Sequence, residues 1–208
     1  MISQRKQDIN NPCKSLKNQG NPKKKPNDFF TMSASKLVRP SLEYKDSFLA
    51  ALAEYHKEGR YLHQDIFRLR KDFPAFIEAL RAERGYPHQP YQDWVEPVPE
   101  TVLWLVKDDE YLGTVDIRHR LNWHLEKWGG HLHFVVRPSM RGKGFGKKIL
   151  LKALPFANYL GIEKALITVD PDDEHAIKII EACGGFFDGE TPETDQFPAR
   201  RHYLIDCT

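Results

Sequence analysis

Apolar residues recur at helical spacing in two segments of the chain after residue 40. The first follows Ser41, a suitable N-cap, and repeats its apolar positions every three or four residues until Gly59. The second begins at Asp72, with Pro74 in its first turn, and ends at Gly85. Both patterns predict amphipathic helices with one face against a core.

A third helical pattern follows a glycine-rich stretch and ends at Gly161. Ile149 and Ala153 lie on its apolar face, one helical turn apart. Pro155 lies inside the pattern. Because proline lacks an amide hydrogen and crowds the preceding turn, we expect a kink near Leu151.

β-branched and aromatic residues alternate or cluster in other short segments, which predicts strands. A hairpin is expected around the acidic turn Asp108-Asp109-Glu110. Antiparallel strands interleaved with helices predict an α/β (α+β) domain of three layers around a mixed, mostly antiparallel twisted sheet. The segments are KLVRPS (36–41), TVLWLVKDDEYLGTVDIRH (101–119), HLHFVV (131–136), KALITVD (164–170) and RHYLIDC (201–207).

The basic residues are concentrated at the N-terminus. Residues 1–36 contain eight Lys or Arg and two Asp or Glu, a balance of +6, so the rest of the chain contributes −4 to the net charge of +2. Few aliphatic residues occur there, and we interpret it as a disordered basic tail ahead of a folded domain at 37–208. Lys23-Lys24-Lys25 could contact nucleic acid, although a solvated tail, or extra residues before a true start at Met32, explains them equally well.

Cysteine usage and hydropathy predict a cytoplasmic protein. No run approaches the roughly 20 apolar residues that a membrane helix needs, and no signal-like apolar stretch opens the chain. Cys13, Cys183 and Cys207 form no C-x-x-C pair, and any disulfide would leave one of them unpaired. Cys183, beside a Gly-Gly helix stop, is interpreted as a small packed residue rather than a nucleophile.

The stretch HLHFVVRPSMRGKGFGKKILLKAL, from His131 to Leu154, joins a strand to a helix through three glycines and several cations. Such a turn brings bare amides to a helix N-terminus, where an anion can bind. From Gly142 the chain reads G-K-G-F-G-K-K, which is one residue short of a nucleotide P-loop and lacks its hydroxyl. The spacing G-x-G-x-G also differs from the G-x-G-x-x-G of dinucleotide sites.

The motif Arg141-x-x-Gly144-x-Gly146, directly after Val136-Arg137-Pro138, resembles the acetyl-CoA signature of the GNAT superfamily of N-acetyltransferases. The similarity covers about residues 37–207 and includes WLVKDDEYLGTVDIRHRLN, GGHLHFVVRPSMRGKGFG, ALITVD and IIEACGG in the family's order. The resemblance implies a GNAT-like fold in which parallel fourth and fifth strands splay apart around the pantetheine arm. It also implies transfer of an acetyl group from acetyl-CoA to a primary amine, by direct attack in a ternary complex and with no metal.

On this resemblance, the amides of the glycine loop hold the diphosphate, because glycine lets a backbone approach closely. Arg141 and the nearby lysines add attraction, although each lysine also fits a solvated helix face. The backbone of Phe134 and Val136 would pair with the pantetheine amides like an added strand. The expected cofactor-binding residues are Phe134, Val135, Val136, Arg141, Gly142, Lys143, Gly144, Phe145, Gly146, Lys147 and Asp173.

An amine must lose a proton before it attacks a thioester, and histidine, with a pKa near about 6.5, suits that task. His131 and His133 are two apart on a predicted strand and project to one face. On the resemblance, their place a few residues before the glycine loop matches where many members of the family keep a carboxylate base. His131 is the first candidate, and packing against aromatic neighbours is the alternative. With His119 or His124 the pair could also bind zinc, which needs three or four convergent ligands, but we expect no metal.

The family's later motif, an Asn followed by a Tyr seven residues on, reads Asp173 and Ile180 here. Isoleucine cannot donate a proton to the departing thiolate, so either Tyr203 or water is expected to serve, or the thiolate leaves unassisted. Asp173 is expected to accept a hydrogen bond from the cofactor arm or to cap the next helix. A non-catalytic acyl-CoA-binding sensor is the alternative function.

Acceptor specificity is expected to come from aromatic and histidine residues that also fit an ordinary core. The amine stays open among small molecules, such as a metabolite, polyamine or aminoglycoside, and a peptide or protein N-terminus. The negative balance of the folded domain argues against nucleic acid, no membrane partner is expected, and a homodimer is one option for the oligomeric state. The residues expected to give acceptor specificity are Tyr61, His63, Tyr86, Tyr91, Trp94, Trp123 and Trp128.

Overall fold

The computed structural model describes residues 34–82 and 96–208. Most of the expected basic tail, the helix end expected at Gly85, and the aromatic residues Tyr86, Tyr91 and Trp94 lie outside the described residues. Cys13 lies outside them as well.

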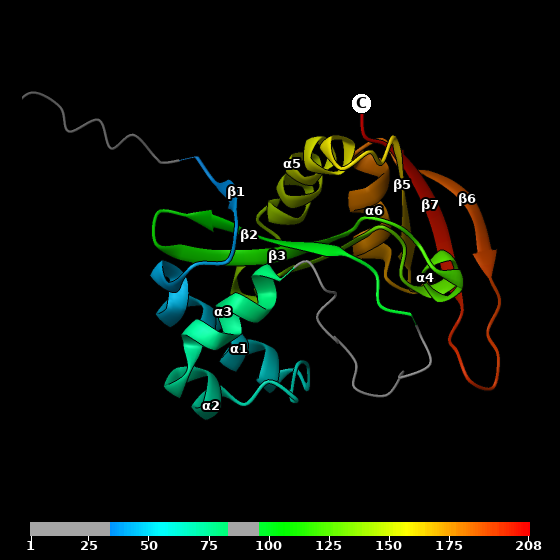
Figure 1. The fold of residues 1–208 in the computed structure, drawn as a ribbon. Helices are drawn as coiled ribbons and strands as arrows, with labels where there is room; N and C mark the ends of the chain where they lie inside the picture. The colour runs from blue at the N-terminus through cyan, green and yellow to red at the C-terminus, as the bar shows by residue number, and fades with distance from the viewer. Residues whose placement is uncertain (1–33, 83–95) are drawn as a thin grey trace, which may run out of the picture. The chain divides into compact units, whose positions relative to one another are not determined.

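In the described ranges, strands are interleaved with helices along the chain (Figure 1). The strands are β1 (Lys36–Val38), β2 (Glu100–Lys107), β3 (Glu110–Arg118), β4 (Leu132–Val136), β5 (Lys164–Val169), β6 (Phe186–Thr191) and β7 (Arg200–Asp206). The helices are α1 (Lys45–Lys57), α2 (Ile66–Lys71), α3 (Phe73–Arg81), α4 (Trp123–Trp128), α5 (Phe145–Tyr159) and α6 (Glu174–Ala182), with 3-10 turns η1 (Leu42–Tyr44) and η2 (Pro138–Met140).

The strands form two antiparallel groups, ordered β1-β2-β3-β4 and β5-β7-β6. The predicted hairpin is present: β2 and β3 pair from Glu100↔Arg118 to Lys107↔Glu110. Its turn is at Asp108, whose φ of 52° is left-handed, and Asp109. β4 and β5 are the neighbouring edges of the two groups. The mixed α/β architecture expected from the sequence is thus confirmed.

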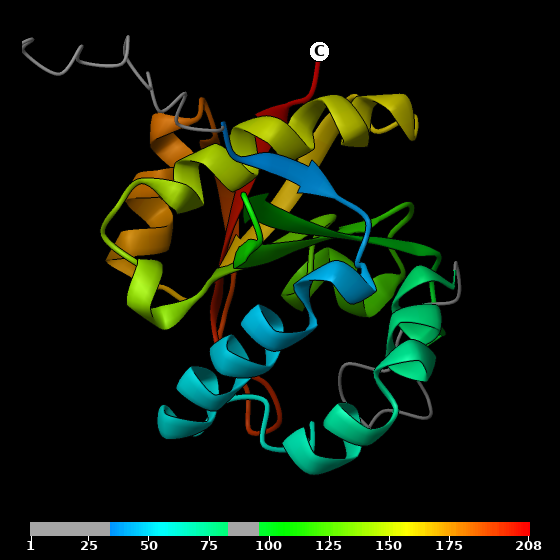
Figure 2. The ribbon, with the colours of Figure 1, turned by 90° about the vertical axis from the view of Figure 1, so that its left-hand side faces the viewer.

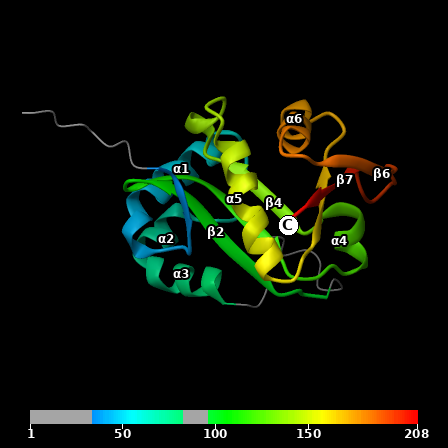
Figure 3. The same ribbon diagram turned by 90° about the horizontal axis from the view of Figure 1, so that it is seen from above.

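Helices cover both faces of the first group, which explains why β2 is buried at nearly every position. Leu103 and Leu105 pack with α5 and α6 in one core, whereas Val102 and Trp104 pack with α1 and α3 in a second core. Figure 2 shows α1 and α5 on opposite sides of these strands. Seen from above, α5 crosses the β2–β4 side while α4 and α6 lie beside β7 (Figure 3).

Three elements were not predicted. α2 and α4 have six residues each and are started by Asp65 and Asn122, whose side chains accept hydrogen bonds from amides of the first turn. β6 pairs with β7 but is largely exposed, so no alternation marks it. Such short or exposed elements lack a hydrophobic period.

α5 contains Pro155 in its interior and continues through it as one helix.

Two carboxylates at the C-terminal end of α1, Glu54 in the helix and Glu58 at its C-cap, bind the segment that follows β4. Glu54 accepts from Arg137 Nε at 2.8 Å and from the Ser139 amide at 3.0 Å. One turn later, both Glu58 oxygens lie 2.8 Å from the two terminal nitrogens of Arg141. The side chains of Arg137 and Glu54 are only 13% and 22% exposed. These pairs fix α1 against the loop between β4 and α5.

We predict that Glu54→Gln lowers the free energy of unfolding at neutral pH by about 1.5–3 kcal/mol, the usual range for a hydrogen bond to a charged group. Burial favours a raised pKa for the Glu54 carboxyl, but the hydrogen bonds from Arg137 and Ser139 outweigh it and hold the pKa below 4.5. A lowered pKa means that this stabilisation is present above 4.5 and is lost as the pH falls through the folded-state value.

Denaturant unfolding of both proteins from about pH 7 to about pH 3 measures the effect. The stability difference should shrink at the acid end, and a difference that does not change with pH would contradict the assignment. Glu174→Gln is the matched control, because the Glu174–Lys178 pair is exposed and should contribute little.

Candidate functional site

A cavity of about 1560 Å³ opens where β4 and β5 separate. The two strands contact each other at their beginnings, where the His131 amide donates to the Leu166 carbonyl at 2.7 Å. From there both strands lead away into the cavity wall, which includes residues 132–136 and 167–170. The parallel, splayed fourth and fifth strands that the sequence implied are therefore present.

β4 presents main-chain groups to this gap. The Arg137 amide donates to Leu112 of β3, and the Arg118 amide of β3 donates to His131, so odd-numbered residues of β4 bond to β3. The backbone groups of Phe134 and Val136 therefore point to the opposite edge, toward β5. The Val136 carbonyl accepts from Arg141 Nε at 3.3 Å. The remaining groups can pair with an extended ligand arm.

The loop before α5 carries a row of amides, which we call the amide row (Gly142–Lys147). Within the described part of the chain, these amides donate no hydrogen bond, whereas Arg141 on one side donates to Pro138 and Lys148 on the other donates to Gly144. Most of the row lines the cavity. Unbonded amides at a helix N-terminus bind anions, so this end of the cavity suits a phosphate group.

The three glycines of the loop have two different roles. Gly142 and Gly144 have φ values of 74° and 78°, and an added Cβ would meet nothing within 4 Å, so they set the turn and keep it open. Gly146 is buried, and a Cβ there would lie 2.7 Å from Ile179 Cδ1 of α6. The third glycine therefore also allows α5 to pack against α6.

The cations of the loop are partly engaged within the protein. Arg141 forms its bidentate pair with Glu58, and Lys143 donates to the Ser139 carbonyl at 2.9 Å. Lys147 lines the cavity together with Lys178 of α6. Arg141 thus holds the loop in place, while most of the amide row, together with Lys147, lines the cavity.

The second chemical feature of the cavity is a histidine–aspartate pair. His133 Nδ1 lies 3.0 Å from Asp116 Oδ2, directly across the β3–β4 ladder. The His133 side chain is 44% exposed, whereas that of Asp116 is 6% exposed, and both residues line the cavity. A buried carboxylate that accepts from Nδ1–H leaves the Nε2 lone pair available to a ligand.

Asp116 was missed from the sequence, although a signal was present. Thr114, Asp116 and Arg118 alternate with apolar residues along a strand whose two faces are both covered. A polar stripe on a covered face needs polar partners, and Tyr111, whose hydroxyl lies 2.7 Å from Thr114 Oγ1, supplies one of them.

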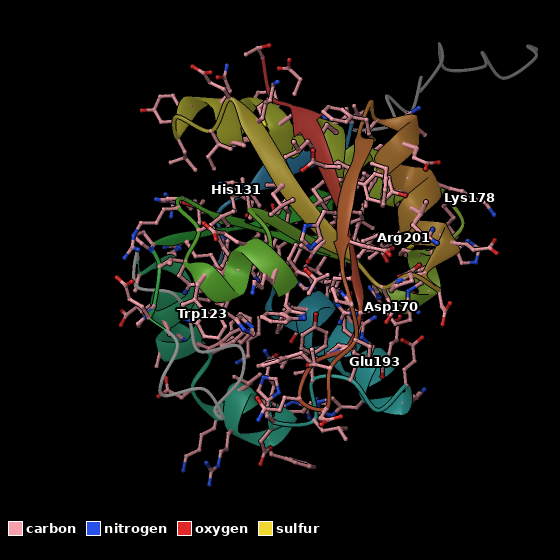
Figure 4. The ribbon with its side chains drawn as sticks, turned by 90° about the vertical axis from the view of Figure 1, so that its right-hand side faces the viewer. Trp123, His131, Asp170, Lys178, Glu193 and Arg201 are labelled. Carbon is pink, nitrogen blue, oxygen red and sulfur yellow. The ribbon has the colours of Figure 1, made fainter. Side chains whose placement is uncertain are left out.

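His131 lies beside β5 rather than in the cavity wall (Figure 4). Its Nδ1 accepts a hydrogen bond from the Leu166 amide at 3.0 Å. Burial, together with the charge of Arg118, lowers its pKa, so the ring is neutral at neutral pH. The structure therefore separates the two candidate histidines: His133 faces the cavity and His131 joins two strands.

The other predicted residues are divided in the same way. Tyr203 is 3% exposed, donates to Glu181 at 3.4 Å and lies outside the cavity lining. Asp173 lines the cavity and caps α6 through the Ala176 amide at 2.9 Å. Ile180 lines the cavity as well, at the position that the resemblance assigns to a tyrosine.

Of the aromatic and histidine residues expected to bind the acceptor, Tyr61, His63 and Trp128 line the cavity. Trp128 stacks on Phe197 with ring centroids 4.3 Å apart, which joins α4 to the connection between β6 and β7. Trp123 is 46% exposed and lies outside the lining. The α1–α2 connection and α4 therefore both contribute aromatic or histidine side chains to the cavity wall.

In residues 34–82 and 96–208, no three His, Cys, Asp or Glu side chains gather as a metal site would require. Over the same ranges, no helix has the length and apolar character needed to cross a membrane.

Comparisons with known proteins support the geometry. A family model described as "Acetyltransferase (GNAT) family" matches residues 63–185. No curated protein matches the chain.

Among solved structures, Mycobacterium smegmatis RimJ in complex with CoA-disulfide is 16% identical, with a TM-score of 0.60 over 84% of this chain and 83% of that one. The Microcin C7 self immunity acetyltransferase MccE, in complex with acetyl-CoA and AMP, is 13% identical, with a TM-score of 0.57 over 83% and 92%. The aminoglycoside acetyltransferase AAC(6')-Ib in complex with coenzyme A is 14% identical, with a TM-score of 0.56 over 83% and 95%. These likenesses concern the fold.

The family match spans more than half of the chain and includes the β4–β5 gap, the amide row and the cap of α6. The chain belongs to the acetyltransferase (GNAT) family.

Proposed function

We propose that the chain is an N-acetyltransferase that transfers the acetyl group of acetyl-CoA to a primary amine, with both substrates bound at once. The observation that carries the proposal is that the amide row lines the same cavity as the open main-chain groups of β4. A diphosphate accepts such N–H groups without a metal, and the pantetheine arm can extend along β4.

We assign the base to His133 rather than to His131. The amine nitrogen needs a lone pair, and His133 Nε2 can take its proton while Asp116 stabilises the imidazolium that forms. The amine nitrogen then bonds to the thioester carbon, the carbon–sulfur bond breaks, and its electron pair leaves with sulfur. The Val136 amide can polarise the carbonyl oxygen. His131 is less suited, because its Nδ1 already accepts from Leu166.

The departing thiolate receives its proton from water or from the His133 imidazolium. Ile180 has no proton to donate, and the Tyr203 hydroxyl is directed to Glu181 outside the cavity. The acceptor amine is a small molecule or a peptide and would enter past Tyr61 and Trp128. A cytoplasmic location and a homodimer remain proposals.

Acetyl-CoA binding is predicted to depend on the conformation of Gly144. Gly144→Ala should weaken the affinity about tenfold, because a left-handed backbone costs a non-glycine residue about 1–2 kcal/mol, and relaxation of the turn would move the amide row. Titration calorimetry with acetyl-CoA measures this.

The control is Gly161→Ala, at the other end of α5. Gly161 has a φ of 86° and is equally open to an added Cβ, so it brings the same strain without contact with the cavity. The affinity of Gly161→Ala for acetyl-CoA should equal that of the wild type. Absence of binding by the wild type at millimolar acetyl-CoA would remove the proposed function.

Turnover is predicted to depend on His133 and Asp116. His133→Ala should lower kcat by about 10²–10⁴-fold, the usual contribution of a general base, and Asp116→Asn should lower it less, since the imidazole remains. The Kd of acetyl-CoA should stay unchanged in both variants. Free-thiol release with a panel of polyamines, aminoglycosides and peptide N-termini measures kcat.

His119→Ala serves as the control, because His119 pairs with Thr101 outside the cavity lining. Full activity of His133→Ala would refute the assignment of the base. Binding of acetyl-CoA by the wild type without turnover across the whole panel would favour the alternative function, an acyl-CoA sensor.

A further inference from the structure

We infer that His131 is a positioning residue whose side chain closes the gap between β4 and β5 and so sets how deep the pantetheine arm can reach. This inference rests on the proposed function for the identity of the arm. The closure itself is a contact of the protein with its own backbone, and it can be tested without any ligand.

The first step is where the hydrogen bonds between the two strands stop. In the described part of the chain, the β4–β5 boundary has two hydrogen bonds, and both involve His131 and Leu166. The His131 amide donates to the Leu166 carbonyl at 2.7 Å, and the Leu166 amide donates to His131 Nδ1 at 3.0 Å. A side-chain nitrogen thus completes a two-bond pair that two backbones would otherwise make.

The second step is why the backbone does not supply this acceptor. The carbonyls of Gly129 and Gly130, just before His131, accept from Arg118 Nη1 at 2.8 and 3.1 Å. Gly130 has a φ of 67°, and a Cβ there would lie 2.5 Å from the Leu166 oxygen. The chain is therefore turned toward Arg118 at close approach to β5, and the imidazole takes over the acceptor role for the Leu166 amide.

The third step is the relation of this pair to the cavity. On the two strands themselves the lining begins at Leu132 and at Ile167, one residue beyond the pair, and Trp128 and Gly129 line the cavity from the connection before β4. His131 and Leu166 therefore mark the point at which β4 and β5 separate. His133 is two residues away on the same strand. A shift of the strands at this point would move the thioester relative to the base while leaving the amide row in place.

The matched variants are His131→Asn and His131→Leu. The Asn Oδ1 is the same number of bonds from the backbone as Nδ1 and can accept from Leu166, whereas Leu fills the space without an acceptor. Amide hydrogen exchange of Leu166, followed by NMR in the full chain, reads the closure directly. The Kd for acetyl-CoA, compared with kcat, shows whether the pantetheine arm is displaced.

The expected result is protection of the Leu166 amide in the wild type and in His131→Asn, and protection about tenfold or more lower in His131→Leu. In His131→Leu, kcat should fall about tenfold or more while Kd stays within about threefold. His131→Asn should keep kcat within about threefold of the wild type. His133→Ala should lower kcat without changing Leu166 protection.

Two outcomes would overturn the inference. One is unchanged Leu166 protection in His131→Leu. The other is a His131→Asn variant that protects Leu166 yet is as inactive as His131→Leu, which would make the imidazole itself the base. If His131→Leu fails to fold, His131→Ala, which also lacks an acceptor, replaces it. If the wild type binds no acetyl-CoA, the exchange data alone decide the closure.

Discussion

The separation of β4 from β5 beyond the His131–Leu166 contact is the constraint on which the rest of the structure depends. Each strand is fully paired on its other side, β4 with β3 and β5 with β7. The pairing of β4 with β3 and of β5 with β7 therefore keeps the two strands apart. α5 and α6 form one core with strands from both groups. Open edges inside a protein need partners, and an extended arm with amides can supply them.

The surrounding elements position the amide row, which we propose as the anion site, in the wall of the cavity at this gap. α1 contributes Glu54 and Glu58, which hold Arg137 and Arg141 on either side of η2. Because these ion pairs hold its two arginines, the loop keeps the amide row at the start of α5. The arginines of the loop and the carboxylates that bind them are thus more than 80 residues apart in the sequence.

The sequence predicted those features whose signal is local. The hairpin around Asp108, the long helix ending at Gly161 and the glycine loop each have their turn residues and periodicity in one segment. α4 and β6 were not predicted, because a six-residue element with few buried side chains shows no hydrophobic periodicity.

The site was only partly predictable for the same reason. The spacing around His131 and His133 placed both near the site but could not distinguish them, because their partners, Leu166 and Asp116, come from other strands. Register across a sheet is set by packing on both faces, which a single segment does not reveal. Tyr203 looked available for proton transfer until its hydroxyl was seen directed to Glu181.

The most direct test of the central claim is a crystal structure of the protein with coenzyme A. The account predicts diphosphate oxygens within about 3 Å of amide nitrogens of the row Gly142–Lys147, with the pantetheine arm between β4 and β5 and the sulfur beside His133. A diphosphate bound elsewhere, or an arm that lies outside the gap, would contradict it.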